Sequence, residues 1–130
     1  MIHLLLNTPP EAVVGDLSDE QLAAMAAAGV PLIDIRRQSE WADTGVIEGS
    51  HLLTFFDERY KYDLDAWLTA FDKVADRSEP FILVCRQGIR TRKLGRFLDG
   101  RPDFRQVNHL HRGISGWIES GRPVSHPKFG

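Results

Sequence analysis

Cys85 is the residue of this chain best suited to covalent chemistry. It is the only cysteine among 130 residues, which excludes an intrachain disulfide framework and a zinc site built from cysteines alone. Five basic residues and no acidic residue lie in the eleven positions after it: Arg86, Arg90, Arg92, Lys93 and Arg96. Neighbouring cations favour the thiolate, which is the nucleophilic form of cysteine. The pattern predicts a nucleophile at a cationic mouth that attracts small anions, although the last three cations are equally compatible with the solvated face of a helix.

The residues around Cys85 predict a loop between a strand and a helix. Phe81–Val84 is a continuous apolar run of strand length, as is typical of a parallel strand buried on both faces. Gly88 allows the loop to curl so that backbone N–H groups point inward, and a helix expected to begin at Thr91 adds the positive end of its dipole. Cys85 is therefore expected at the carboxyl end of a parallel strand, where open α/β sheets bind their ligands.

The remaining elements alternate in the order expected of an α/β protein. Ser18 and Gln21 form a capping-box pattern that opens a helix before Gly29. The other predicted strands are Leu32–Ile35, Ser50–Leu53 and Gln106–Leu110, and the other predicted helices are one capped by Ser39 and ended by Gly45, one over Leu64–Val74 and one around Ile114–Ile118. Three tryptophans and an apolar helix stripe are expected in the core: Trp41, Trp67, Trp117, Leu94, Phe97 and Leu98. The alternation predicts a mostly parallel central sheet flanked by helices on both faces.

The segment from Cys85 to Thr91 resembles the active-site loop of rhodanese-domain sulfurtransferases. Three more segments resemble signatures of that family in the right order: Leu32–Arg36 with Glu40–Trp41, Gly45–Ser50, and Leu110–Trp117 with Gly121–Val124. The resemblance covers about residues 13 to 125, which implies an N-terminal extension over 1–12 and a single rhodanese-like domain over 13–130. The chain departs from the family pattern at Val46, Glu48, Ser50 and Arg112. Arg112, which stands where the family often has glycine, either adds a cation to the mouth or points to solvent.

The resemblance implies a persulfide cycle without a metal or an organic cofactor. Cys85 would take a sulfur atom from a small anionic donor such as thiosulfate and pass it to cyanide or a thiol. The residues implied to surround the substrate are Arg86, Gln87, Gly88, Ile89 and Arg90, and those implied to support the loop are Asp34, Arg36 and Thr91. The choice of acceptor would depend on mouth residues, for which Arg112, Phe55 and Phe56 are candidates.

Three other functions use the same residues. Cysteine-based phosphatases and arsenate reductases have five residues between cysteine and arginine, whereas four lie between Cys85 and Arg90. A sulfur-relay module that receives persulfide from a partner desulfurase would use identical chemistry at Cys85. A metal site formed by Cys85, His109 and His111 is disfavoured, because a metal would quench the thiolate that the loop is suited to activate.

The overall composition excludes several classes of protein. Hydrophobic residues make up 42% of the chain and its formal net charge is −2, which disfavours a disordered segment and a polybasic nucleic-acid binder. The longest mostly apolar stretch, Leu22–Ile33, is too short for a membrane span, and residues 1–12 lack the basic start of a secretory signal. These features predict a cytoplasmic protein without membrane or nucleic-acid partners. Residues 1–12 could form an edge strand, a dimer contact or a loose arm.

Overall fold

The computed structural model describes residues 14–129, so the expectations for residues 1–12 lie outside the described residues. The strands are β1 (Gly15–Leu17), β2 (Leu32–Asp34), β3 (His51–Leu52), β4 (Phe81–Val84) and β5 (Val107–Leu110). The helices are α2 (Asp19–Ala27), α3 (Gln38–Thr44), α4 (Leu64–Phe71), α5 (Ile89–Asp99) and α6 (Gly113–Glu119). In this part of the chain, no helix has the length and hydropathy needed to cross a bilayer.

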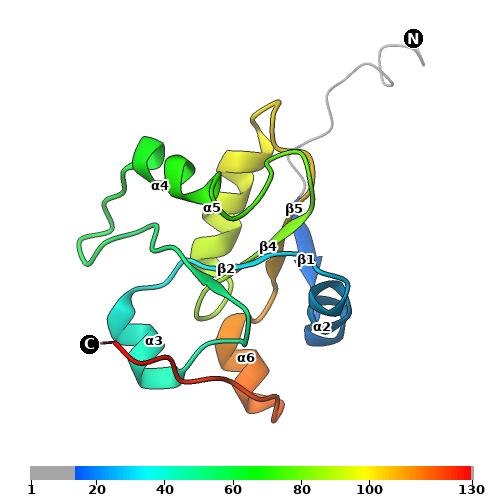
Figure 1. Ribbon diagram of the computed structural model, residues 1–130, viewed down its shortest axis with the longest axis vertical. Helices are drawn as coiled ribbons and strands as arrows, with labels where there is room; N and C mark the ends of the chain where they lie inside the picture. The colour runs from blue at the N-terminus through cyan, green and yellow to red at the C-terminus, as the bar shows by residue number, and fades with distance from the viewer. Residues whose placement is uncertain (1–13, 130) are drawn as a thin grey trace.

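All five strands found in residues 14–129 form one parallel sheet with the order β1-β5-β4-β2-β3 (Figure 1). This arrangement confirms the predicted α/β fold. The chain leaves β2 through α3 toward β3 on one side, and leaves β4 through α5 toward β5 on the other side. The carboxyl ends of β2 and β4 therefore flank the point where the strand order reverses, which is where doubly wound sheets bind ligands.

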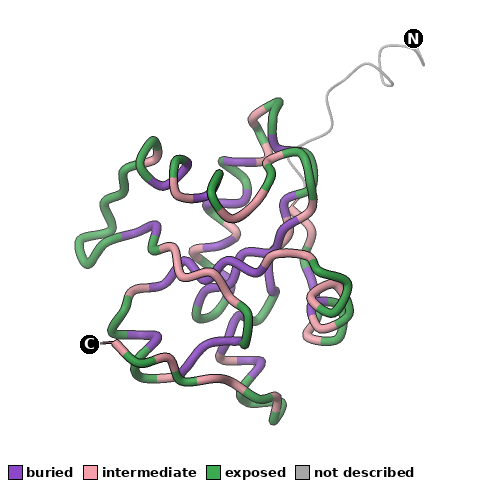
Figure 2. The backbone as a smooth tube through the Cα atoms, viewed as in Figure 1, coloured by how far each residue is buried: buried purple, intermediate pink, exposed green. Residues whose placement is uncertain are grey.

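Each face of the sheet carries its own hydrophobic core, because side chains alternate along the strands. Phe81, Leu83 and Cys85 pack with side chains of α4 and α5. Ile82 and Val84 point the other way and pack with side chains of α2 and α6. Figure 2 shows the buried backbone gathered in the central strands. The predicted placement of helices on both faces is therefore confirmed, and the core of the first face extends to Cys85.

Two predicted helix boundaries are confirmed and one predicted cap is wrong. The capping box of Ser18 and Gln21 is present at α2, and Gly45 ends α3 as predicted. The prediction that Ser39 caps α3 is wrong. Arg37 takes the N-cap position, because the Glu40 carboxylate reaches back to accept the Arg37 backbone N–H at 3.0 Å.

Two other differences concern the start of α5 and the faces of α5 and α6. Helix α5 begins at Ile89 rather than Thr91, because Gly88 adopts a left-handed φ of 86° and turns the chain directly into the helix. Phe97, expected in the core with Leu94 and Leu98, is exposed, and so is Ile118 at the end of α6. The buried faces of these helices are centred on other side chains, namely Thr91, Leu94 and Leu98 in α5 and Ile114 and Trp117 in α6. The three tryptophans are buried as predicted.

Strand β1 is an element that sequence patterning did not predict. It contains only three residues, two of which, Gly15 and Asp16, have little preference for strands. Parallel pairing with β5 places it at the edge of the sheet. The pairing brings Asp16 opposite His109, which becomes important at the candidate site.

Candidate active site

Cys85 follows the central strand β4 directly, beside the end of β2. Val84 pairs with Asp34 in the sheet, and the Ile35 backbone N–H donates to the Val84 carbonyl at 3.0 Å. The residue is only 1% exposed, so a molecule that reacts at this sulfur must displace atoms packed around it.

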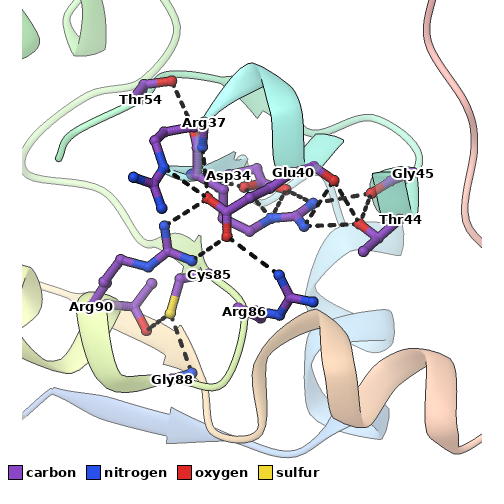
Figure 3. Close-up of polar contacts among 12 residues, drawn as sticks. Asp34, Arg37, Glu40, Thr44, Gly45, Thr54, Cys85, Arg86, Gly88 and Arg90 are labelled. Carbon is purple, nitrogen blue, oxygen red and sulfur yellow. Dashed lines mark hydrogen bonds and ion pairs between the residues drawn. The ribbon is translucent and has the colours of Figure 1, made fainter. Parts of the chain in front are cut away.

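The loop after Cys85 turns a backbone N–H toward the sulfur. Gly88 donates its N–H to the Cys85 Sγ at 3.2 Å (Figure 3). Gly88 is also the N-cap residue of α5, where no side chain satisfies the first N–H groups of the helix. The amide of Gly88 and the positive end of α5 together favour negative charge on the sulfur or on an atom attached to it.

The start of α6 holds the Cys85 loop through backbone hydrogen bonds. The Ile114 N–H donates to the Cys85 carbonyl at 2.9 Å, and the Ser115 N–H donates to the Arg86 carbonyl at 3.0 Å. Gly113 has φ of 62° and leaves no room for a Cβ beside the Arg86 carbonyl. The N-terminal N–H groups of α6 are therefore used to hold the carbonyls of the Cys85 loop.

Glu40 is a site residue whose partners the sequence did not reveal. It lies on α3 and binds Arg90 with two hydrogen bonds of 2.6 and 2.8 Å, across fifty positions of sequence, and it lies 4.0 Å from Arg86 (Figure 3). Burial raises the pKa of Glu40, but hydrogen bonds from Arg90 and from the Arg37 backbone outweigh burial and lower this pKa to about 2. The hydrogen bonds to Glu40 raise the pKa of Arg90. An acidic residue is therefore inserted into the predicted cationic mouth.

Asp34 and Arg36 form a buried ion pair that organises α3. Arg36 binds the Asp34 carboxylate through Nε at 3.0 Å and Nη2 at 2.8 Å. Its guanidinium also donates to Thr44 Oγ1 at 2.8 Å and to the Gly45 carbonyl at 3.0 Å, at the end of α3. The pair thus binds α3 directly and is connected to the Cys85 loop through Glu40.

Thr91 contacts the Cys85 sulfur and connects it to two further residues, His109 and Asp16. Its Oγ1 is 3.4 Å from the Cys85 Sγ and 2.8 Å from Nδ1 of His109. Nε2 of His109 is in turn 2.8 Å from Asp16. Thr91 and His109 are buried. Spacing alone could not reveal this row, because its members come from α5, β5 and the unpredicted strand β1.

The other residues predicted for the site differ in their surroundings. Gln87 in the loop is exposed, as are Ile89, Lys93 and Arg96 on α5. Arg112 is exposed and pairs with Glu119 at 3.0 Å. Phe55 and Phe56 are buried in the core beside α4, so the expectation that they line the mouth is wrong.

His109 of β5 and His111, which follows β5 directly, do not form a metal site with Cys85. Both contact Asp16, His109 through Nε2 and His111 through Nδ1, and Thr91 separates His109 from the sulfur. Across residues 14–129 no group of three or more His, Cys, Asp or Glu side chains is arranged to hold a metal ion.

Comparison with known proteins places the chain in a family. The family model described as Rhodanese-like domain matches residues 18–120, which include every described helix and every strand except β1. A comparison with curated proteins found no match.

Three solved structures illustrate the similarity of fold. Rv0390 from M. tuberculosis has a TM-score of 0.72 at 19% identity, over 88% of this chain and 98% of that chain. The thiosulfate sulfurtransferase from Pseudomonas aeruginosa has a TM-score of 0.69 at 20% identity, over 88% of this chain and 21% of that chain. RPA3614 from Rhodopseudomonas palustris, described as a possible tyrosine phosphatase, has a TM-score of 0.63 at 21% identity, over 86% and 85% of the two chains. At these identities the similarity concerns the fold.

Proposed function

The chain belongs to the rhodanese-like domain family, and from this premise we propose that it is a sulfurtransferase whose Cys85 carries the transferred sulfur. The donor is a small anion with a sulfane sulfur, such as thiosulfate, and the acceptor is cyanide or a thiol. One observation carries the proposal: the Gly88 N–H points at the Cys85 Sγ from 3.2 Å, at the N-terminus of α5. This arrangement favours a negatively charged sulfur species at Cys85.

The proposed cycle has two displacement steps on sulfur. In the first, the Cys85 thiolate attacks the outer sulfur of thiosulfate, the S–S bond of thiosulfate breaks, and sulfite leaves with the electron pair. In the second, the acceptor attacks the outer sulfur of the resulting persulfide and the Cys85 thiolate leaves. The electrons balance without an oxidant or reductant, and the covalent intermediate divides one transfer into two easier steps.

Arg86 is the loop cation best placed to meet the anionic donor. Its side chain is 50% exposed and lies 4.0 Å from Glu40, whereas the Arg90 side chain is 12% exposed and closely paired. A donor could replace the Arg86–Glu40 contact at little cost, because the contact is long, Arg86 is half exposed and Glu40 keeps its closer partner Arg90. Arg90 is better suited to hold the loop.

Intact mass spectrometry tests the proposal directly. Purified protein incubated with thiosulfate should gain one sulfur atom, lose it on addition of cyanide, and release thiocyanate. The Cys85→Ser variant is the matched control and should neither gain mass nor turn over. The proposal fails if wild-type protein gains no sulfur while Cys85→Ser equals wild type in the thiocyanate assay. Hydrolysis of an aryl phosphate without sulfur transfer would instead favour the phosphatase alternative.

The exposed side chain of Ile89, the first residue of α5, favours a second candidate function, that of a sulfur carrier for a partner protein. Ile89 is 67% exposed directly beside the Cys85 loop, and an apolar side chain at this position suits contact with another protein. A carrier would gain sulfur from a cysteine desulfurase acting on cysteine faster than from thiosulfate. Ile89→Ser should slow loading by the desulfurase but leave loading by thiosulfate unchanged.

A further inference from the structure

A row of polar side chains leads from the Cys85 sulfur through the interior to the protein surface. Thr91 and His109 form its buried middle, with contacts of 3.4 Å to the sulfur and 2.8 Å between them. Asp16 ends the row 2.8 Å from His109, and its side chain is 49% exposed. The first and last members are thus a nucleophile and a carboxylate in contact with water.

The hydrogen bonds of this row permit only certain proton positions. Hydrogen bonding and charge from His111 lower the pKa of Asp16 despite the opposing effect of burial, so Asp16 is a carboxylate that only accepts hydrogen bonds. His109 must therefore carry a proton on Nε2. When His109 is neutral, its Nδ1 accepts from the Thr91 hydroxyl, and the Thr91 oxygen is then left to accept the S–H of Cys85.

We propose that Thr91, His109 and Asp16 form a proton relay that removes the thiol proton of Cys85, an inference that rests on the proposed role of Cys85 as the sulfur carrier. The S–H proton passes to the Thr91 oxygen while the Thr91 hydroxyl proton passes to His109 Nδ1. The products are a thiolate, which accepts a hydrogen bond from Thr91, and an imidazolium beside the Asp16 carboxylate. Thr91 and His109 are then positioning residues that couple the charge of the sulfur to that of the imidazole.

The charges around His109 suit a base that is neutral at rest. Burial lowers the pKa of His109; Asp16 of β1 opposes this shift, whereas Arg92 of α5 and His111, just after β5, add to it. The neutral imidazole is therefore available to accept a proton, and the nearby carboxylate stabilises the imidazolium once it forms. Asp16 also binds the exposed His111 at 2.7 Å, so the proton can reach water at the far end of the row from the sulfur.

The rate of Cys85 alkylation by iodoacetamide provides the first test. Cys85 is the only cysteine, and iodoacetamide alkylates the thiolate form of cysteine rather than the neutral thiol, so the rate reports the thiolate fraction. Thr91→Val removes the hydroxyl with little change of shape, and Thr91→Ser is the matched control that keeps the hydroxyl. At neutral pH, Thr91→Val should react about tenfold more slowly than wild type, the size expected for one hydrogen bond to a charged group, and its rate–pH curve should move to higher pH. Thr91→Ser should follow wild type. The relay is excluded if all three proteins share one curve.

A second test does not depend on the folding of a Thr91 variant. Titration of the His109 imidazole by NMR in wild type and in Cys85→Ser should differ, since a thiolate within one hydroxyl of the ring favours imidazolium. The proton affinity of His109 should fall about tenfold in Cys85→Ser, and equal titrations would overturn the proposal.

The relay and the sulfurtransferase proposal fail separately. Neither alkylation nor NMR titration requires sulfur transfer, and thiosulfate loading of the same wild-type sample is measured by mass. Sulfur loading together with unchanged alkylation and titration in the variants rejects only the relay. Altered alkylation and titration in the variants, without sulfur loading of the wild type, rejects only the sulfurtransferase activity.

Discussion

At the scale of single residues, the two arginines of the Cys85 loop have different surroundings and should have different roles. Sequence spacing treats Arg86 and Arg90 alike, as cations near a nucleophile. In the structure Glu40 binds Arg90 closely and Arg86 only at 4.0 Å. The positive charge near the sulfur is thus partly neutralised, and the charge that remains for an anionic donor lies mainly on Arg86.

This difference predicts opposite phenotypes for the matched substitutions Arg86→Gln and Arg90→Gln. Arg86→Gln should raise the KM for thiosulfate about tenfold and change the free energy of unfolding by less than about 0.5 kcal/mol, as is usual for an exposed side chain. Arg90→Gln leaves the buried Glu40 without its main partner and should lower the free energy of unfolding by about 3 kcal/mol. Steady-state kinetics and urea unfolding measure the two effects. Equal KM values in wild type and Arg86→Gln would contradict this assignment.

At the scale of elements, the Cys85 loop depends on its fit against the turn between β5 and α6. Gly88 and Gly113 both have left-handed φ angles, and both lie against backbone carbonyl groups of the facing segment. A Cβ on Gly88 would overlap the His111 carbonyl, and a Cβ on Gly113 would overlap the Arg86 carbonyl. The loop and the turn are therefore complementary in backbone shape, and a side chain on either glycine would separate them.

A comparison of two glycines with the same backbone angle tests this fit. Gly88 and Gly49 both have φ of 86°, but a Cβ on Gly49 meets nothing within 4 Å whereas a Cβ on Gly88 overlaps the His111 carbonyl oxygen. Both alanine variants bear the cost of the left-handed conformation, about 1–2 kcal/mol. Gly88→Ala bears an additional overpacking cost of about 2 kcal/mol, so its free energy of unfolding should lie about that much below that of Gly49→Ala. Gly88→Ala should also lose alkylation and sulfur loading at Cys85. Urea unfolding and mass spectrometry check this, and equal effects of the two substitutions would exclude the proposed fit.

Elements with strong local signals were predictable from the sequence, and those that depend on pairing were not. Phe81–Val84 is a strand at the predicted bounds because its continuous apolar run suits a central parallel strand. The capping box of α2 is likewise a local pattern. Strand β1 has no such signal and exists because it pairs with β5. The sequence favours Thr91 as the start of α5, two residues late, because the left-handed backbone of Gly88, which sets the start, leaves no side-chain signal.

At the scale of the whole molecule, the site is assembled from distant segments that the strand order brings together. The position of Cys85 at the carboxyl end of β4 could be predicted, because the apolar run before it has a recognisable strand pattern, whereas Asp34 and Arg36 were indicated only by the family resemblance. Glu40 and Asp16 could not be predicted as partners of Arg90 and His109. Their contacts arise only after β2 and β5 take their places on either side of β4 and β1 pairs with β5. Against the effect of burial, hydrogen bonds from Arg90 and the Arg37 backbone lower the pKa of Glu40, whereas burial itself, opposed by Asp16, lowers the pKa of His109.

These two shifts predict how the stability of the folded chain depends on pH. The pKa of Glu40 falls from 4.5 to about 2, and burial lowers the pKa of His109 from 6.5. As pH falls, the unfolded chain therefore binds each of these two protons at a higher pH than the folded chain does. Stability should therefore begin to fall as pH drops below about 6.5, through His109, and fall further between about 4.5 and 2, through Glu40. Complete loss of the Glu40 contribution corresponds to about 3 kcal/mol.

Urea unfolding at a series of pH values measures this dependence, with one matched variant for each range. Glu40→Gln should flatten the lower range most, because its amide does not titrate, and His109→Asn should flatten the upper range while the lower range stays as in wild type. Several carboxylates with lowered pKa values, among them Asp16, lie elsewhere in the described chain, so Glu40→Gln should retain a smaller acid dependence. A wild-type stability that is constant from neutral pH to pH about 3 would show that the folded chain neither holds Glu40 charged nor holds His109 neutral.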